Sequence, residues 1–357
     1  MKKSIFLILP NAGGGGSEKV LINLANLLSK NFNVTLCFIN LDKKKYLNFV
    51  SKKIKIINLN KKTTKLSFFK LLKILIFNKY QYVLSSIFHI NILSILLKLF
   101  SFSKFKLIIR ETNKISQKEK KNFYKLCLIF IFYRFADLII SPSILINREI
   151  ESFYIKKTKI KLLNNPVIIK KNNKKEDLKK IKIFLKKTKY LITMTRLEKH
   201  KNIEFILDCL KEINKFKKLK LLILGEGSCE DYISQLIRRL GLIKNVMIVK
   251  FLSNPYNLLK RSSLYINSSY YEGQSNSVLE ALYFNVPVIS ANNGSHTNFI
   301  KKYSYGYVFN KYSKLKVSNN ILKLIDKKLK RIDSNFYHEV SGLSITKRFI
   351  KLINNIR

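Results

Sequence analysis

Short apolar runs alternate with helical patterns along most of this chain. In its first half, strands are predicted at 5–9, 34–38, 54–57, 83–86, 107–109 and 138–141, and helices at 20–28, 68–77, 90–100 and 118–135. Repeated strand-then-helix patterning restricts the fold to a doubly wound parallel sheet. In such sheets, ligands bind at the carboxyl ends of the strands.

A second alternating series of strands and helices follows residues 170–177. This stretch is polar and has neither the periodicity of a strand nor that of a helix. The predicted strands of the second series are 190–194, 220–224, 246–251, 264–266 and 286–289, and its helices include 203–213, 313–333 and 343–356. A chain of 357 residues is long enough for two domains that each bury a core. We therefore predict domains at 1–168 and 179–340, a linker at 169–178, and a last helix, 341–357, packed on the first domain.

The segment from Glu272 to Glu280 places two carboxylates eight positions apart around a small polar turn. Residues 273–277 have poor helix propensity and precede a helical pattern, so they predict a helix N-terminus, which is suited to bind a phosphate. Glu280 lies two turns into that helix, about 12 Å along it if all eight steps are helical. The two carboxylates could bond hydroxyls at opposite ends of one ligand, or be ordinary solvated glutamates of a capped surface helix.

This segment resembles the E-x7-E motif of glycosyltransferase family 4, retaining enzymes of GT-B fold, in the variant that reads E-G-x-S-N. Residues 286–289 match the strand that follows in the family, with Asn285 where glycine is usual. Upstream, residues 195–202 resemble the family's G-R-L-x-x-x-K-G/N segment, with Thr195 in place of glycine. The resemblance implies that Arg196 and Lys201 hold the donor diphosphate, which two cations on one strand-to-helix turn can do together.

Two glycine-containing turns also match the family. Residues 221–227 are an apolar run closed by Gly225-Glu226-Gly227, which alone indicates only a buried parallel strand. Residues 13–18 contain four glycines before Ser17 and Glu18 and resemble the family's G-G-x-E loop, although a tight turn without a ligand would look the same. The resemblance implies catalytic roles for Glu272, Arg196 and Lys201, with Glu272 on the transferred sugar, and donor contacts from Glu280 (on the ribose), Gly273, Gln274, Ser275, Asn276, Gly225, Gly15 and Gly16.

Acceptor-side residues are predicted from the first half. Arg110, Glu111 and Thr112 follow a buried strand at a position where many family members carry Glu-His. Thr112 stands where the family has histidine. With Glu18, these residues are predicted to face the acceptor in a cleft between the two domains.

The charge of the chain points to an anionic partner. It has 69 Lys plus Arg against 21 Asp plus Glu, a formal net charge of +48. Such a balance suggests nucleic acid or an anionic membrane, although the even spread of Lys beside Asn and Ile also fits an AT-rich genome. The family resemblance implies the inner leaflet as the anionic partner, and clustered Lys with Phe and Leu between 61 and 106 would serve as a docking face there. Alternatively, Phe68, Leu71, Leu72 and Leu75 are simply the core face of an amphipathic helix.

Three sequence patterns argue against a transmembrane helix, a disulfide framework and a metal site. No apolar run reaches eighteen residues, which predicts no transmembrane helix. The family resemblance, with its membrane-associated acceptors, implies a peripheral location on the inner face of the cytoplasmic membrane. The four cysteines are isolated, and the four histidines lack metal-ligand spacing. We therefore expect no metal and no cofactor, since Arg, Lys and helix-terminal N–H groups can neutralise a leaving diphosphate.

The sequence thus predicts a retaining, metal-independent glycosyltransferase of the hexosyltransferase class. It would move a sugar from a nucleotide-diphosphate donor, UDP-sugar favoured, to a membrane-associated glycan or lipid-linked acceptor in bacterial surface polysaccharide assembly. Two alternatives are a basic nucleic-acid-binding protein without catalysis and a sugar-nucleotide epimerase of GT-B architecture. No nucleic-acid motif is present, so no nucleic acid is expected as partner.

Overall fold

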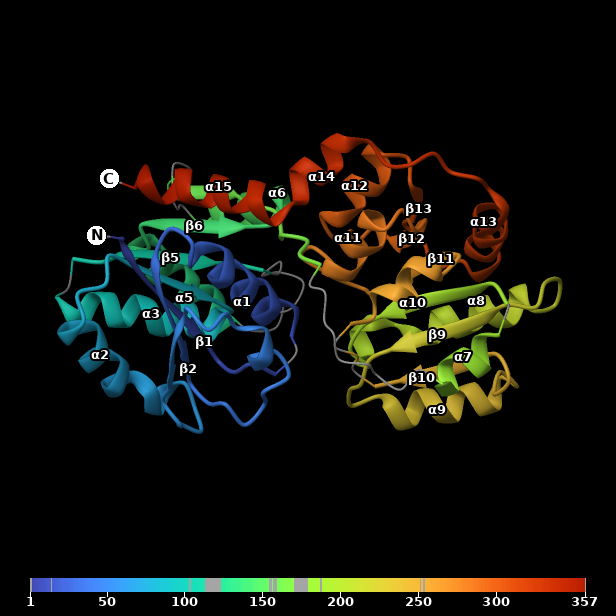
Figure 1. Cartoon of the computed structure of the whole chain (residues 1–357), viewed down its shortest axis with the longest axis horizontal. Helices are drawn as coiled ribbons and strands as arrows, with labels where there is room; N and C mark the ends of the chain where they lie inside the picture. The colour runs from blue at the N-terminus through green and yellow to red at the C-terminus, as the bar shows by residue number, and fades with distance from the viewer. Residues whose placement is uncertain are drawn as a thin grey trace. The chain divides into compact units, whose positions relative to one another are not determined.

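The computed structural model describes residues 2–13, 15–102, 104–112, 123–153, 156, 159–169, 179–186, 188–250, 252 and 254–356. The chain forms two compact units, drawn in Figure 1. Unit 1 is Met1–Ile168 together with His338–Arg357, and unit 2 is Ile169–Tyr337. Unit 2 therefore ends three residues before the predicted boundary at 340. The predicted linker lies outside the described residues from 170 onward.

Unit 1 contains a seven-stranded parallel sheet in the order β3-β2-β1-β4-β5-β6-β7. Its strands are β1 (Ser4–Leu9), β2 (Asn33–Phe38), β3 (Lys55–Asn58), β4 (Tyr82–Ser86), β5 (Lys106–Arg110), β6 (Leu138–Ser141) and β7 (Ile160–Leu162). Its helices are α1 (Gly16–Leu28), α2 (Phe68–Phe77), α3 (Phe88–Ser101), α5 (Phe123–Phe132), α6 (Ile144–Glu151) and α15 (Gly342–Asn354), with 3-10 turns at Leu47–Phe49, Lys65–Ser67 and Tyr133–Phe135.

Helices cover both faces of this sheet because side chains along each strand alternate between them. Phe6 and Ile8 of β1 pack in the core beneath α2, α3, α5 and α6. Leu7 and Leu9 pack on the opposite face, beneath α1 and α15. The last helix of the chain therefore completes the core of the first unit, and Val167 N donates to Val340 O (2.8 Å) where the chain returns.

Unit 2 contains a six-stranded parallel sheet in the order β10-β9-β8-β11-β12-β13. Its strands are β8 (Tyr190–Met194), β9 (Lys220–Leu224), β10 (Val246–Val249), β11 (Leu264–Asn267), β12 (Val288–Ala291) and β13 (Gly306–Phe309). Its helices are α7 (Lys179–Leu185), α8 (Ile203–Ile213), α9 (Glu230–Arg239), α10 (Tyr256–Arg261), α11 (Asn276–Tyr283), α12 (His296–Lys302), α13 (Lys314–Asp326) and α14 (Ser334–Val340, which runs on into unit 1), with a 3-10 turn at Lys199–Lys201.

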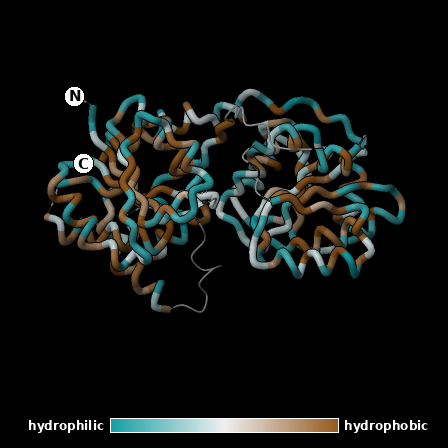
Figure 2. The backbone as a smooth tube through the Cα atoms, turned by 60° about the horizontal axis from the view of Figure 1, so that its bottom comes forward, coloured by the Kyte–Doolittle hydropathy of each residue, from teal (hydrophilic) through white to brown (hydrophobic). Residues whose placement is uncertain are grey.

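The predicted fold class is confirmed: each unit is a Rossmann-like, doubly wound parallel sheet. Strand order reverses between β1 and β4 in unit 1 and between β8 and β11 in unit 2. At such a reversal, the loops that follow the two neighbouring strands diverge to opposite faces and leave room for a ligand. Figure 2 shows hydrophobic residues running through the strands and covering helices of each unit.

Two predicted helices have different bounds. The helix predicted at 118–135 is helical over Phe123–Phe132 and continues as a 3-10 turn to Phe135, and residues 118–122 lie outside the described part. The helix predicted at 313–333 ends at Asp326. Beyond it, Ile332 N donates to the side chain of Asn285 (2.8 Å), a tertiary bond that a helical backbone could not make. No helix that the structure describes is long and apolar enough to cross a membrane.

We expect Phe349→Ala in α15 to destabilise unit 1 by about 3–5 kcal/mol, because this fully buried ring fills a core that cannot collapse completely around the cavity. Leu343→Ala, on the exposed side of the same helix, should change stability by less than about 0.5 kcal/mol. Urea denaturation of both variants measures the difference. Equal midpoints would show that α15 does not belong to the core of unit 1.

Candidate active site

Predicted catalytic and donor residues from two loops meet where strand order reverses in unit 2. The loop after β8 carries Arg196 and Lys201, and the loop after β11 leads to α11. The two loops are bonded to each other: Ser268 Oγ lies 2.9 Å from Lys201 O and 2.7 Å from Asn202 O, and Tyr270 N donates to His200 O (2.8 Å). These bonds hold the cationic turn against the segment that carries Glu272.

Lys201 and Glu272 form the central ion pair of this site. Lys201 Nζ lies 2.5 Å from Glu272 Oε1, and both side chains are largely buried. Ser269 Oγ donates to the same oxygen (3.0 Å), and Glu272 N donates to Asn293 O (3.0 Å). Burial opposes ionisation of Glu272, but the charge and hydrogen bond of Lys201 outweigh it and lower the pKa of this carboxyl below 4.5. Glu272 is therefore an anion at neutral pH and can accept hydrogen bonds or stabilise positive charge.

Arg196 is exposed and, among the described residues, has no ion-pair partner. Its charge nevertheless acts on the same group of residues, because burial first, then Lys201 and Arg196, lower the pKa of His200. The His200 ring stacks on Tyr271, with centroids 4.9 Å apart and planes 12° from parallel. Arg196 is thus a cation on the rim of the site that is available to an anionic ligand.

Gly225 and Gly227 allow the loop after β9 to approach the turn that carries Arg196. A Cβ on Gly225 would lie 1.7 Å from Thr195 O, and one on Gly227 would lie 2.4 Å from Leu197 O. Leu197 N donates to Glu226 O (3.0 Å) in the same contact. Both glycines are therefore required by backbone packing next to Arg196. A direct donor contact from Gly225 stays a prediction.

The N-terminus of α11 is held by residues from the start of α12. Helix α11 begins after Ser275, whose side chain makes no capping bond. Ser275 N donates to His296 Nδ1 (3.2 Å), and Ser295 N donates to Gly273 O (2.9 Å). These contacts between protein groups fix the turn at 273–275, which orients the helix-terminal N–H groups that follow.

His296 is the residue of this site that the sequence did not reveal. It is fully buried, and its Nδ1 accepts the Ser275 backbone N–H, so the proton sits on Nε2, 3.0 Å from Ser290 Oγ. Burial lowers the pKa of His296 to about 4. Asn267 Nδ2 lies 3.1 Å from the same ring nitrogen. The sequence did hold one signal for His296: polar residues follow both β11 and β12. Because parallel strands end at one edge of a sheet, such residues are expected to lie close together.

Glu280 is the fifth residue of α11, so it lies just over one turn into the helix and not the predicted two turns, and it is buried. Gln274 and Ser275 are buried as well, whereas Asn276 is partly exposed. Glu272 lies before the helix, so the two glutamates occupy separate positions along the segment. This agrees with two different ligand contacts rather than one carboxylate pair.

In unit 1, the glycine loop lies at the other reversal of strand order. Ser17 Oγ and Ser86 Oγ, 2.9 Å apart, join the start of α1 to the end of β4. A Cβ on Gly15 would lie 2.1 Å from Glu18 Oε2, so the Glu18 side chain folds back over the first turn of α1. Gly16 is exposed at the start of that helix. The Glu18 carboxylate therefore lies directly against Gly15 of the same loop.

The predicted acceptor residues at the end of β5 are more buried than expected. Glu111 accepts from Tyr133 Oη (2.7 Å) and Thr112 N (3.0 Å), and Arg110 Nη2 donates to Asn165 Oδ1. Burial lowers the pKa of Arg110 to about 10 despite the opposing effect of Glu111. Arg110 Nη1 has no hydrogen-bond partner among the described residues. Arg110 and Glu111 thus form an internal polar cluster, with Thr112 half-buried at its edge.

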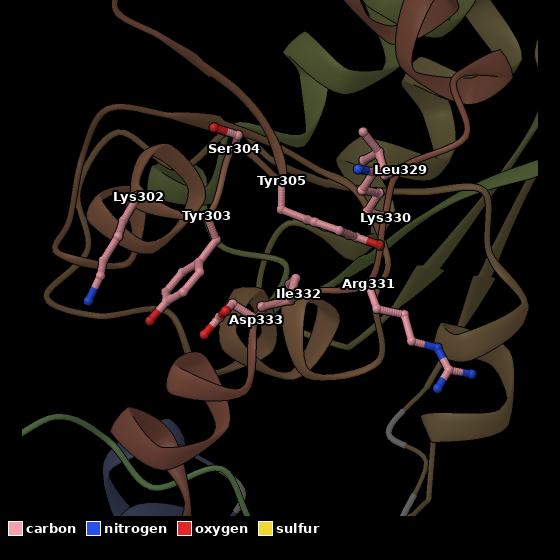
Figure 3. Close-up of a pocket in the computed structure, with 9 residues that line it drawn as sticks. All are labelled: Lys302, Tyr303, Ser304, Tyr305, Leu329, Lys330, Arg331, Ile332 and Asp333. Carbon is pink, nitrogen blue, oxygen red and sulfur yellow. The ribbon is translucent and has the colours of Figure 1, made fainter.

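A separate cavity of about 360 Å³ lies elsewhere in unit 2 (Figure 3). It is lined by residues 302–305, at and after the end of α12, and 329–333, after α13. None of the predicted site residues lines it, so it is not the candidate active site. Within the described residues, no group of three or more His, Cys, Asp or Glu is placed to hold a metal ion.

Comparisons with known proteins indicate the family and the fold that this chain resembles. Residues 174–338 match the family model described as glycosyl transferases group 1. An uncharacterized glycosyltransferase of Methanocaldococcus jannaschii is 33% identical over 213 residues, 57% of this chain and 52% of that protein, so the match spans about half of that relative. The Campylobacter jejuni N-acetylgalactosamine-N,N'-diacetylbacillosaminyl-diphospho-undecaprenol 4-alpha-N-acetylgalactosaminyltransferase is 29% identical over 308 residues, 82% of this chain and 81% of that protein.

Among solved structures, Anabaena HepE in complex with UDP-glucose has a TM-score of 0.82 at 15% identity, covering 98% of this chain and 99% of that chain. The fold of the chain is therefore that of the GT-B glycosyltransferases. Residues 174–338, which hold the candidate active site, match the glycosyl transferases group 1 model, and the relatives with similar sequences are named glycosyltransferases. Membership of family 4 in particular stays a prediction.

We expect acid to destabilise the protein through His296. Because its pKa is about 4 in the fold and 6.5 when unfolded, it has no effect above pH 6.5. Below that, the unfolded chain binds a proton that the native protein does not, which costs about 3 kcal/mol by pH 4. Glu272 acts in a lower window, because its stabilisation is lost only as pH falls below 4.5.

Urea denaturation between pH 7 and pH 4 measures this effect. His296→Gln should flatten the dependence relative to the wild type, whereas His338→Gln, at an exposed position, should leave it unchanged. A wild-type slope in the His296→Gln variant would mean that His296 is not buried in its neutral form.

We expect Arg196→Ala to weaken UDP binding by about 1.5–3 kcal/mol, the range for a hydrogen bond to a charged group, or about 10- to 160-fold. Lys201→Ala should weaken it by a similar amount, and it also leaves Glu272 without its counter-ion. Titration calorimetry with UDP measures both, with Lys199→Ala on the same turn as the exposed control. If Arg196→Ala and Lys199→Ala bind UDP equally well, Arg196 does not contact the diphosphate.

Proposed function

We propose that this chain is a retaining glycosyltransferase that moves a sugar from a nucleotide-diphosphate donor, UDP-sugar favoured, to a lipid-linked or other membrane-associated glycan in surface polysaccharide biosynthesis. The observation that carries this proposal is an anionic Glu272, paired with Lys201, beside the N-terminus of α11. One short segment thus offers positive groups for a diphosphate and a negative group for a sugar.

The donor diphosphate would bind between Arg196 and the first turn of α11. Arg196 supplies a guanidinium without an ion-pair partner among the described residues, and the helix supplies N–H groups. Lys201 would share its protons between Glu272 and a phosphate oxygen. These groups place positive charge where the leaving diphosphate develops negative charge, so no metal is required for that task. UDP is favoured as carrier because Anabaena HepE was solved with UDP-glucose.

The two glutamates would bind opposite ends of the donor. Glu280 in α11 suits the ribose, and Glu272 suits the transferred sugar, where positive charge develops as the glycosidic bond breaks. Because its pKa is lowered, Glu272 stays ionised and cannot act as a general acid. The acceptor would attack on the face from which the diphosphate leaves, and the departing phosphate would take the acceptor proton, which retains the anomeric configuration.

The acceptor is proposed from the Campylobacter relative. Its name describes a diphospho-undecaprenol-linked saccharide as acceptor, and the similarity covers 82% of this chain. Arg110, Glu111, Thr112 and Glu18 stay the proposed acceptor-side residues. Because Arg110 and Glu111 are buried, they would act by supporting the loop after β5, and Thr112 is better placed to touch the acceptor.

Transfer of labelled sugar from UDP-sugars to a polyprenyl-diphosphate-linked saccharide tests the proposal. We expect a product whose new linkage has the anomeric configuration of the donor, as read by NMR. Inversion would reject the retaining mechanism. Conversion of the donor sugar without any acceptor would instead identify an epimerase.

Within this assay, we expect Glu272→Gln to lower kcat about 10²-fold, since charge stabilisation of this kind acts in the transition state. Glu280→Gln should mainly raise KM for the donor, because a ribose contact is the same in ground and transition states. Steady-state kinetics separates the two effects, with donor hydrolysis as the readout if no acceptor is accepted. Wild-type turnover in Glu272→Gln would remove this residue from sugar transfer.

A further inference from the structure

Helix α2 in unit 1 is apolar on two sides. Leu71 and Leu75 are buried in the core, and Phe68 and Leu72 pack partly against it, so these four residues form the core face of the helix. This resolves the two interpretations that the sequence left open for them. A membrane-docking role therefore cannot rest on those residues.

The opposite side of α2 is also apolar, although it faces outward. Phe69 is 81% exposed and Phe77 is 74% exposed, with Ile76 and Lys73 between them at helical spacing. A surface helix of a globular protein normally presents polar residues on its outer side. The outer side of α2 thus exposes large apolar side chains that are not part of the core of unit 1.

This apolar surface continues onto the end of α3, which lies beside α2 (Figure 1). The ring of Phe68 contacts Phe69 at 5.4 Å and Phe100 at 5.9 Å between centroids, so Phe69 and Phe100 flank one ring. Phe102, directly after α3, is 95% exposed. We call the following exposed residues the α2–α3 patch: Leu66, Phe69, Ile76, Phe77, Leu99, Phe100 and Phe102.

The charge around the α2–α3 patch has one sign. The sequence contains no Asp or Glu between Asp42 and Glu111. Exposed lysines of this segment include Lys62, Lys65, Lys70, Lys73 and Lys104. A nearby acid from outside the segment, Asp137, is already paired with Lys98 at 2.5 Å. Among the described residues, Lys65 and Lys73 have no ion-pair partner.

We propose that the α2–α3 patch docks unit 1 onto a bilayer that contains anionic lipids. Phenylalanine and leucine side chains insert at the boundary between headgroups and acyl chains, and lysines around them reach lipid phosphates. The aliphatic members of the patch favour a bilayer over nucleic acid, because leucine and isoleucine cannot stack on bases. A second copy of this chain would face the patch with the same positive charge.

Co-sedimentation with vesicles tests this inference without any sugar donor, so its result stands apart from the proposed activity. The wild type should bind vesicles of equimolar phosphatidylcholine and phosphatidylglycerol at low salt, bind less at high salt, and bind phosphatidylcholine vesicles weakly. The double variants Phe69→Gln/Phe102→Gln and Lys65→Gln/Lys73→Gln should each lower partitioning about tenfold or more. All four side chains are exposed, so both variants should fold.

The matched control is Phe216→Gln/Lys218→Gln, an exposed Phe and Lys in unit 2, which should partition within about twofold of the wild type. An equal loss in the control, equal binding to neutral vesicles, or no binding at low salt would overturn the proposal. So would sedimentation velocity showing a dimer that Phe69→Gln/Phe102→Gln dissociates, because the patch would then join two copies. Competition by single-stranded RNA that the same variant abolishes would assign the patch to nucleic acid.

Discussion

Parallel pairing within each sheet is the constraint on which the rest of this structure depends. Because every strand of a unit points the same way, all the loops that follow them meet at one edge, where strand ends leave backbone groups free. In unit 2 this brings together the turn after β8, the segment after β11 and the start of α12. Ser268, Ser275 and His296 then bond these loops to one another. The direction of the strands therefore brings the loops of the site together, and side-chain hydrogen bonds then hold them in place.

Two opposite charges, on Lys201 and Glu272, are buried together at the carboxyl edge of the sheet in unit 2. Burying one charge alone is costly, but the two together, with Ser269, satisfy each other. The pair also leaves unit 2 with a ready anion and a cation that a phosphate oxygen can share. His296 stays neutral nearby because burial and Lys201 both disfavour its protonation. The charge states of Lys201, Glu272 and His296 are thus set by protein contacts and burial alone.

Local patterns predicted the alternation of strands and helices and the bounds of α2 and α8, because propensity and periodicity act over a few residues. They also predicted a turn at 273–277 before α11, although its last two residues, Asn276 and Ser277, are the first two of the helix. Contacts between distant residues could not be predicted in this way. Ser275 bonds His296 across 21 positions, and Ile332, beyond the end of α13 at Asp326, bonds Asn285 across 47. The exposed side of α2 was equally hard to predict, because apolar residues lie on both sides of this helix and Lys70 and Lys73 alone do not separate an outer side from a core side.

The return of α15 to unit 1 has a consequence for biosynthesis. Ile345, Phe349 and Ile353 belong to the core that covers α1 and one face of the first sheet. When the ribosome has made residues 1–168, that face still lacks its last helix, and it stays incomplete until all of unit 2 has been made. The first domain to emerge is therefore the last to be finished. A nascent chain interrupted within unit 2 leaves part of the apolar face beside α1 open to chaperones and to aggregation.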